Sequence, residues 1–268
     1  MNNHAKEPIG VFDSGLGGLT VVKELIHHLP NERIVYFGDT ARVPYGTKSG
    51  ETIIRYSREI VRALLKFKVK MVVVACNTAS SLALDVLKKE FDLPVIGVIE
   101  PGARKAVEVT RNKKVGIIAT SSTVKSGKYA QKLVELDKQI IVTSQACPLF
   151  VPLVEEGWFE HAVTFQVARE YLGVMKKNKI DTLILGCTHY PLLKGVLHNV
   201  MGPKVQLVDS AQEVALQVKG LLTKGRLLRT QLKPGQHMFI VSDEPKQFQR
   251  LALRFLGGGV KNVRRSNL

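Results

Sequence analysis

The sequence contains little cysteine: three residues, at positions 76, 147 and 187, in a chain of 268. Three irregularly spaced cysteines cannot form a disulfide framework, so we expect free thiols in a reducing compartment. No apolar run is long enough to cross a bilayer, and the polar residues 1–6 lack the apolar segment of a secretory signal. These absences predict a cytoplasmic protein with no membrane partner.

Acidic residues are also scarce beside basic ones, 23 against 39, which leaves a formal net charge of +16. The basic residues are scattered along the chain, and no run of them resembles a nucleic-acid-binding arm. We therefore expect a solvated basic surface, with nucleic-acid binding limited to non-specific charge attraction.

Nucleotide-binding signatures are missing as well. The glycine-rich segment 15–18 follows an apolar run, but Thr20 stands where a dinucleotide fingerprint needs its third glycine. Asp13 would place a negative charge where the pyrophosphate should lie. We interpret the glycines as a tight turn that lets the backbone approach a small ligand, with Asp13 and Ser14 directed into the site.

Short apolar runs alternate with amphipathic stretches along the whole chain, which is typical of an α/β protein with parallel sheets covered by helices on both faces. Ligands of such folds bind at the carboxyl ends of the strands. The predicted strands are 8–12, 33–37, 71–75, 94–98, 115–119, 140–144, 181–185, 205–208 and 237–241.

Cys76 and Cys187 have look-alike settings, each after an apolar run and before polar residues that can start a helix. This repetition predicts two similar lobes related by pseudo-two-fold symmetry, with the active site between them. We expect residues 1–97 with 209–268 in the first lobe and 98–208 in the second. If helices begin after the thiols, their N–H groups would favour thiolates.

Each cysteine also has simpler interpretations. An isolated cysteine after a buried strand is commonly a small core residue, and this suits Cys147, which no polar turn follows. Zinc is an alternative because Cys187 and His189 lie two apart, but no second ligand pair accompanies them. Redox chemistry is weaker because there is no Cys-x-x-Cys. His189 fits better as a proton partner of Cys187.

The combined motifs resemble those of the glutamate racemases, in the aspartate/glutamate racemase superfamily. The motifs are residues 12–19 (FDSGLGGL), 39–46 (DTARVPYG), 75–79 (ACNTA), 154–157 (VEEG) and 186–191 (GCTHYP). The resemblance implies interconversion of L- and D-glutamate without a cofactor or metal, supplying D-glutamate for peptidoglycan and hence for cell-wall biogenesis and cell shape. It also implies the two-lobed α/β fold; we expect a homodimer.

The resemblance assigns roles to individual residues. Cys76, paired with Asp13, would act on D-glutamate, and Cys187, paired with His189, on L-glutamate, with Asp39 and Glu155 as supporting acids. The implied substrate contacts are Asp13, Ser14, Tyr45, Gly46, Asn77, Thr78, Thr188 and His189, together with Thr120 and Thr123 from the second copy of the first turn.

Two alternatives stay open at this point. An aspartate racemase would use the same two thiols on a shorter substrate, and the local motifs do not measure pocket length. A binding module that exploits the +16 charge would instead bind nucleic acid or protein with a steep salt dependence.

Overall fold

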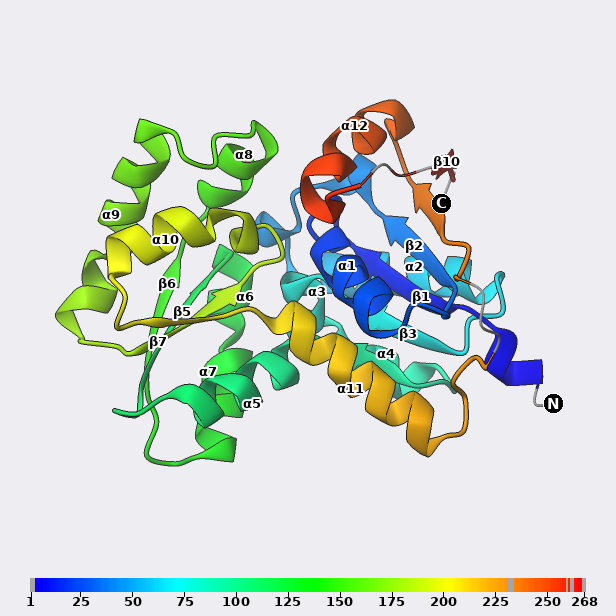
Figure 1. Cartoon of the computed structure of the whole chain (residues 1–268), viewed down its shortest axis with the longest axis horizontal. Helices are drawn as coiled ribbons and strands as arrows, with labels where there is room; N and C mark the ends of the chain where they lie inside the picture. The colour runs from blue at the N-terminus through cyan, green and yellow to red at the C-terminus, as the bar shows by residue number, and fades with distance from the viewer. Residues whose placement is uncertain (1–2, 231–233, 259, 261–262, 267–268) are drawn as a thin grey trace.

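The computed structural model describes residues 3–230, 234–258, 260 and 263–266 of the chain. Two parallel sheets stand side by side, each covered by helices on both faces (Figure 1). The first sheet has the order β10-β9-β2-β1-β3-β4 and the second the order β6-β5-β7-β8. This is the predicted fold class, and the second sheet repeats the order β2-β1-β3-β4 of the first.

The strands begin and end within two residues of the predicted ones, except for β10, which was not predicted. In the first sheet they are β1 (Ile9–Asp13), β2 (Ile34–Gly38), β3 (Met71–Val74), β4 (Val95–Gly97), β9 (Met238–Val241) and β10 (Val263–Arg265); in the second, β5 (Lys114–Ala119), β6 (Ile141–Ala146), β7 (Thr182–Gly186) and β8 (Gln206–Val208).

Helices on one face of the first sheet are α1 (Leu19–His28), α11 (Ser210–Lys224) and α12 (Pro245–Leu256), and on the other α2 (Gly50–Leu65), α3 (Asn77–Leu82) and α4 (Leu84–Glu90). The second sheet packs against α5 (Ile99–Val109) and α7 (Lys128–Leu136) on one face and against α8 (Phe150–Glu155), α9 (Ala162–Lys177) and α10 (Lys194–Met201) on the other. The short α6 (Ser121–Ser126) follows β5, and single 3₁₀ turns lie at η1 (Asn3–Lys6), η2 (Thr40–Arg42), η3 (Tyr45–Thr47) and η4 (Tyr190–Leu193).

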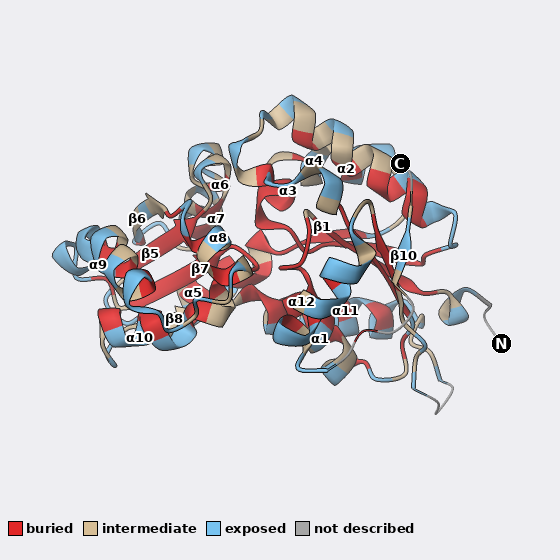
Figure 2. Cartoon of the chain, turned by 90° about the horizontal axis from the view of Figure 1, so that it is seen from above, coloured by how far each residue is buried: buried red, intermediate tan, exposed pale blue. Residues whose placement is uncertain are grey.

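The central strands are buried while the outer faces of the helices are exposed (Figure 2). β1, β2, β3 and β7 are buried along their whole length, which explains why they read as continuous apolar runs rather than alternating ones. One core cluster runs from β1 and α1 through α11 to the second sheet. Within the described residues, no helix combines the length and apolar character needed to cross a bilayer.

The chain leaves the first sheet after β4 and returns to it at β9, which pairs in parallel with β2. We propose that residues 1–97 and 209–268 form the first lobe and residues 98–208 the second, because each boundary lies between strands of different sheets. Helix α11 packs on both α1 and α5, so it lies along the junction of the two lobes.

Candidate active site

A cavity of about 320 Å³ lies where the carboxyl ends of the two sheets meet, and both candidate thiols line it. Cys76 follows β3, which pairs with β1, and Cys187 follows β7, which pairs with β5. The lining residues are Ser14, Val43, Pro44, Tyr45, Gly46, Thr47, Cys76, Asn77, Thr78, Thr120, Ser121, Pro148, Val151, Pro152, Glu155, Cys187, Thr188 and His189. Most of the predicted site residues are therefore brought together.

Cys76 is the N-cap residue of α3, and its sulfur accepts a hydrogen bond from the backbone N–H of Ala79 at 3.5 Å. Burial raises the pKa of the Cys76 thiol to about 12, and the nearby Asp13 carboxylate acts in the same direction. The helix N–H and the Ser14 hydroxyl oppose this shift without cancelling it. At neutral pH Cys76 is therefore a protonated thiol.

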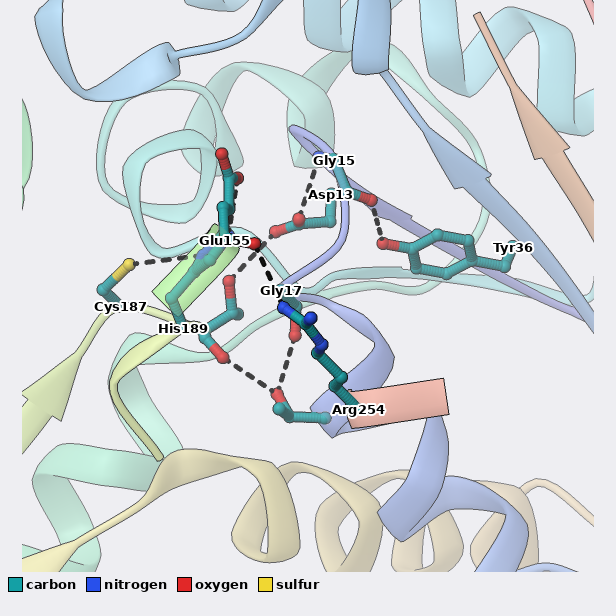
Figure 3. Close-up of polar contacts among 10 residues, drawn as sticks. Asp13, Gly15, Gly17, Tyr36, Glu155, Cys187, His189 and Arg254 are labelled. Carbon is teal, nitrogen blue, oxygen red and sulfur yellow. Dashed lines mark hydrogen bonds and ion pairs between the residues drawn. The ribbon is translucent and has the colours of Figure 1, made fainter. Parts of the chain in front are cut away.

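Cys187 has a different partner. Its sulfur lies 3.9 Å from His189 Nδ1, while His189 Nε2 lies 3.0 Å from Glu155 Oε1 (Figure 3). Burial disfavours the charged imidazolium, but the hydrogen bonds with Cys187 and Glu155 outweigh it and raise the pKa of His189 to about 10. A positive charge beside a sulfur stabilises the thiolate. The two half-sites therefore differ: burial and a carboxylate act on the Cys76 sulfur, whereas a histidine held by a glutamate lies beside the Cys187 sulfur.

The helix predicted directly after Cys187 is absent. A 3₁₀ turn begins only at Tyr190 and the α-helix only at Lys194, so no helix start caps this sulfur. The expectation of two equivalent helix N-termini is wrong for this half. The His189 side chain lies beside this sulfur instead.

Asp13 lies beneath the cavity and does not line it. Its fully buried carboxylate accepts hydrogen bonds from the Gly15 N–H at 2.9 Å and from the Thr188 hydroxyl at 3.4 Å. The Tyr36 hydroxyl donates to the Gly15 carbonyl at 2.7 Å, which fixes the same turn from the other side (Figure 3). Asp13 thus holds the glycine turn of one lobe against Thr188 of the other.

The glycine turn approaches the opposite half-site closely, and the expected approach of its backbone to a small ligand stays a prediction. A Cβ atom on Gly17 would lie 2.2 Å from Thr188 Oγ1 and 2.6 Å from His189 Nδ1. Only a residue without a side chain lets the turn and the Cys187–His189 segment pack at this distance. Thr20 joins the same contact, since its hydroxyl lies within hydrogen-bond distance of the Gly17 and Thr188 carbonyls.

Asp39 also lies outside the cavity. Its buried carboxylate accepts hydrogen bonds from the Tyr45 hydroxyl, from Arg42 Nε at 2.7 Å and from the Ser242 hydroxyl at 2.9 Å. Burial, reinforced by Asp39, raises the pKa of Tyr45, which therefore remains a neutral donor. This arrangement favours Asp39 as the support of the Tyr45–Gly46 turn rather than as a proton donor to substrate.

Three threonine hydroxyls join the two lobes at the cavity wall. Thr78 Oγ1 lies 2.9 Å from Thr120 Oγ1 and 3.2 Å from Thr123 Oγ1, and the last two are 2.9 Å apart. Thr123 does not line the cavity, so it orients the other two from behind. The predicted contact Asn77 is fixed similarly, because its side-chain oxygen accepts from the Tyr129 hydroxyl at 2.7 Å.

Seven further residues line the cavity that the sequence analysis did not name as site residues: Val43 and Pro44 of the motif 39–46, Thr47, Ser121, Pro148, Val151 and Pro152. They are mainly apolar, and no pattern distinguishes such residues from ordinary core. Cys147, by contrast, is fully buried outside the lining, which fits its predicted packing role. Glu156, next to Glu155, is exposed and lies outside the lining.

A larger cavity of about 650 Å³ lies between α1, β2, β9 and α12, but its described lining includes no cysteine and no carboxylate. In the described part of the chain no three His, Cys, Asp or Glu side chains are grouped so as to hold a metal ion. Of these two cavities, the smaller one holds both thiols, together with a carboxylate and a histidine beside them.

Two thiols that line one small cavity, one of them beside a histidine, define a site for removing and returning a proton. The model of the Asp/Glu/Hydantoin racemase family matches residues 9–218, and the chain belongs to this family. Racemases of this kind are isomerases. The family match covers the second sheet, strands β1 to β4 of the first and every candidate site residue.

Individual relatives match nearly the whole chain. The glutamate racemase of Geobacter metallireducens is 52% identical over 255 residues, which cover 95% of this chain and 94% of that protein. The crystal structure of the glutamate racemase isoform RacE1 from Bacillus anthracis has a TM-score of 0.96 at 41% identity and 99% coverage of both chains. The glutamate racemase of Francisella tularensis in complex with D-glutamate has a TM-score of 0.92 at 38% identity, with 98% of each chain covered.

Replacement of Gly17 tests the contact between the two half-sites. We expect Gly17→Ala to lower kcat/KM for racemisation about 100-fold, because the methyl group displaces Thr188 and His189 by an ångström or more. Gly220→Ala is the control, since a Cβ there meets nothing within 4 Å. Equal activity of the two variants would show that the close approach is not needed for the reaction.

Proposed function

We propose that this protein is a cofactor-independent glutamate racemase that interconverts L- and D-glutamate with two cysteines. The observation that carries the proposal is the lining of one cavity by Cys76 and Cys187, which follow corresponding strands of two similarly ordered sheets. Similarity to glutamate racemases from several bacteria over nearly the whole chain supports the choice of substrate.

The chemistry requires a base on one face of the α carbon and an acid on the other. In the direction that starts with Cys187, its thiolate removes the α proton while the Cys76 thiol donates a proton to the opposite face. Cys187 then holds the thiol and Cys76 the thiolate, which is the starting state of the reverse reaction. The His189 imidazolium stabilises the first thiolate, and the Ala79 N–H and the Ser14 hydroxyl stabilise the second.

The carbanionic transition state needs strong local stabilisation because the α carbon is a far weaker acid than a thiol. The described lining holds no Lys or Arg side chain, so His189 is the one side chain there that carries a positive charge. Hydroxyl and amide groups, together with the N–H groups that start α3 and α6, would bind the two carboxylates of glutamate. Ser14, Asn77, Thr78, Thr120 and Thr188 are the proposed side-chain contacts.

Each thiol keeps its predicted enantiomer in this proposal: Cys76 acts on D-glutamate and Cys187 on L-glutamate. Asp13 acts on Cys76 by raising the pKa of its thiol. Glu155 acts on Cys187 through its contact with His189. Because burial raises the pKa of Cys76 to about 12, its thiolate, once formed, is a strong base. The proposed cellular role is cytoplasmic supply of D-glutamate for peptidoglycan. The homodimer stays a prediction, which light scattering of the purified protein tests.

The activity itself is tested by the circular dichroism of L-glutamate incubated with purified protein in reductant, without pyridoxal phosphate or added metal. We expect the signal to decay to zero, and D-glutamate to decay to the same end point, because the two enantiomers have equal free energy. L-Aspartate is the control substrate, and its circular dichroism signal should decay far more slowly. Preferential decay of aspartate, or of neither amino acid, would contradict the proposal.

Single replacements test the two-thiol mechanism. Cys76→Ser and Cys187→Ser should each lower kcat about 100- to 10,000-fold in both directions, because a hydroxyl is a much weaker acid and its alkoxide is not available at neutral pH. The measurement is the initial rate from each enantiomer, together with far-ultraviolet circular dichroism to verify the fold.

Cys147→Ser is the control for this pair. Its thiol is equally buried but lies outside the cavity, so the rate per folded molecule should stay within about twofold of wild type while stability falls by about 1–3 kcal/mol. A fully active Cys76→Ser or Cys187→Ser variant would rule out the mechanism.

A further inference from the structure

Helix α12 belongs to the first sheet's side of the molecule, yet two of its residues touch the acid–base pair of the second. Phe248 and Ala252 are buried in the core, and Phe248 packs against Tyr36 with ring centroids 6.0 Å apart. The helix also packs along α1. Its position is therefore set by the first lobe.

The next turn of α12 reaches across to α8. Arg254 Nη1 donates a hydrogen bond to the Glu155 backbone carbonyl at 3.3 Å (Figure 3). Its guanidinium lies 5.9 Å from the centre of the Phe159 ring. A Cβ atom on Gly157 would lie 2.5 Å from the same nitrogen, so the guanidinium rests directly on the backbone that ends α8. This one side chain spans residues 155–159.

The adjacent residue contacts the other member of the pair. The Phe255 ring is buried and stands perpendicular to the His189 ring, with centroids 5.7 Å apart and an angle of 87°. Since His189 Nε2 and the Glu155 carboxylate lie 3.0 Å apart, α12 fixes the backbone of one partner and the ring of the other.

We propose that Arg254 is a positioning residue for catalysis: from the first lobe, it holds the end of α8 so that Glu155 keeps the His189 ring directed at the Cys187 sulfur. Arg254 lies outside the cavity lining and touches neither sulfur. Its effect passes through Glu155 and His189 to one thiol alone. The inference rests on the proposed racemase function for its kinetic readout.

The test compares Arg254→Ala and Arg254→Lys with Arg250→Ala, an exposed arginine one turn earlier on the same helix. We expect Arg254→Ala to lower kcat/KM about 10-fold, since the Glu155 carbonyl loses its charged donor. Arg254→Lys restores one donor without the planar guanidinium and should recover part of the loss. Arg250→Ala should match wild type.

The equilibrium constant of a racemisation is one, so kcat/KM falls equally in both directions and cannot reveal which thiol is affected. α-Deuterated substrates can. In Arg254→Ala the primary isotope effect on kcat/KM should rise for the enantiomer that Cys187 deprotonates and not for its mirror image. Loss of activity with both isotope effects unchanged would mean general loosening and would overturn the inference.

A second readout needs no turnover. The ring resonances of His189 in the nuclear magnetic resonance spectrum should shift in Arg254→Ala and stay in place in Arg250→Ala. Unchanged His189 resonances would overturn the inference whatever reaction the protein catalyses. Absence of glutamate racemisation by wild type would instead overturn the proposed function, and the His189 resonances would still decide the positioning of the ring.

Discussion

The carboxyl ends of β3 and β7, which belong to different sheets, have to meet at one cavity of about 320 Å³. The rest of the structure depends on this constraint. The contact of Gly17 with Thr188 and His189 satisfies it, because a side chain on Gly17 would overlap both. Asp13 reinforces the contact through the Gly15 N–H and the Thr188 hydroxyl. The buried Asp13 carboxylate is thus a structural link between lobes as well as a neighbour of Cys76.

The half-sites share a strand order but differ in chemistry. Burial and Asp13 keep Cys76 protonated, while Cys187 faces an imidazolium whose pKa is raised to about 10. A racemase needs one acid and one base in every turnover, and two identical environments would favour the same protonation state in both. Burial beside Asp13 at one thiol and a histidine beside the other make the two environments different before substrate binds.

The fold could be predicted from the sequence because fully buried parallel strands read as short continuous apolar runs. Cys76 and Cys187 could be found because polar residues follow them at strand ends. β10 could not, since its residues are few, partly exposed and basic. The buried supports were also out of reach: nothing in the pattern shows that Asp39 binds Tyr45, that Gly17 faces His189, or that the distant Arg254 meets Glu155. Such contacts depend on how the lobes pack, which local patterns do not encode.

The central claim is that one group removes the α proton and a second group delivers another proton to the opposite face of the carbon. Its most direct measurement is the α-hydrogen content of both enantiomers during the first few per cent of reaction of L-glutamate in deuterium oxide. Two thiols predict that the D-glutamate formed carries deuterium at the α carbon while the remaining L-glutamate keeps its hydrogen. D-Glutamate that retains the original hydrogen would mean that one group removes and returns the same proton, and would contradict the account.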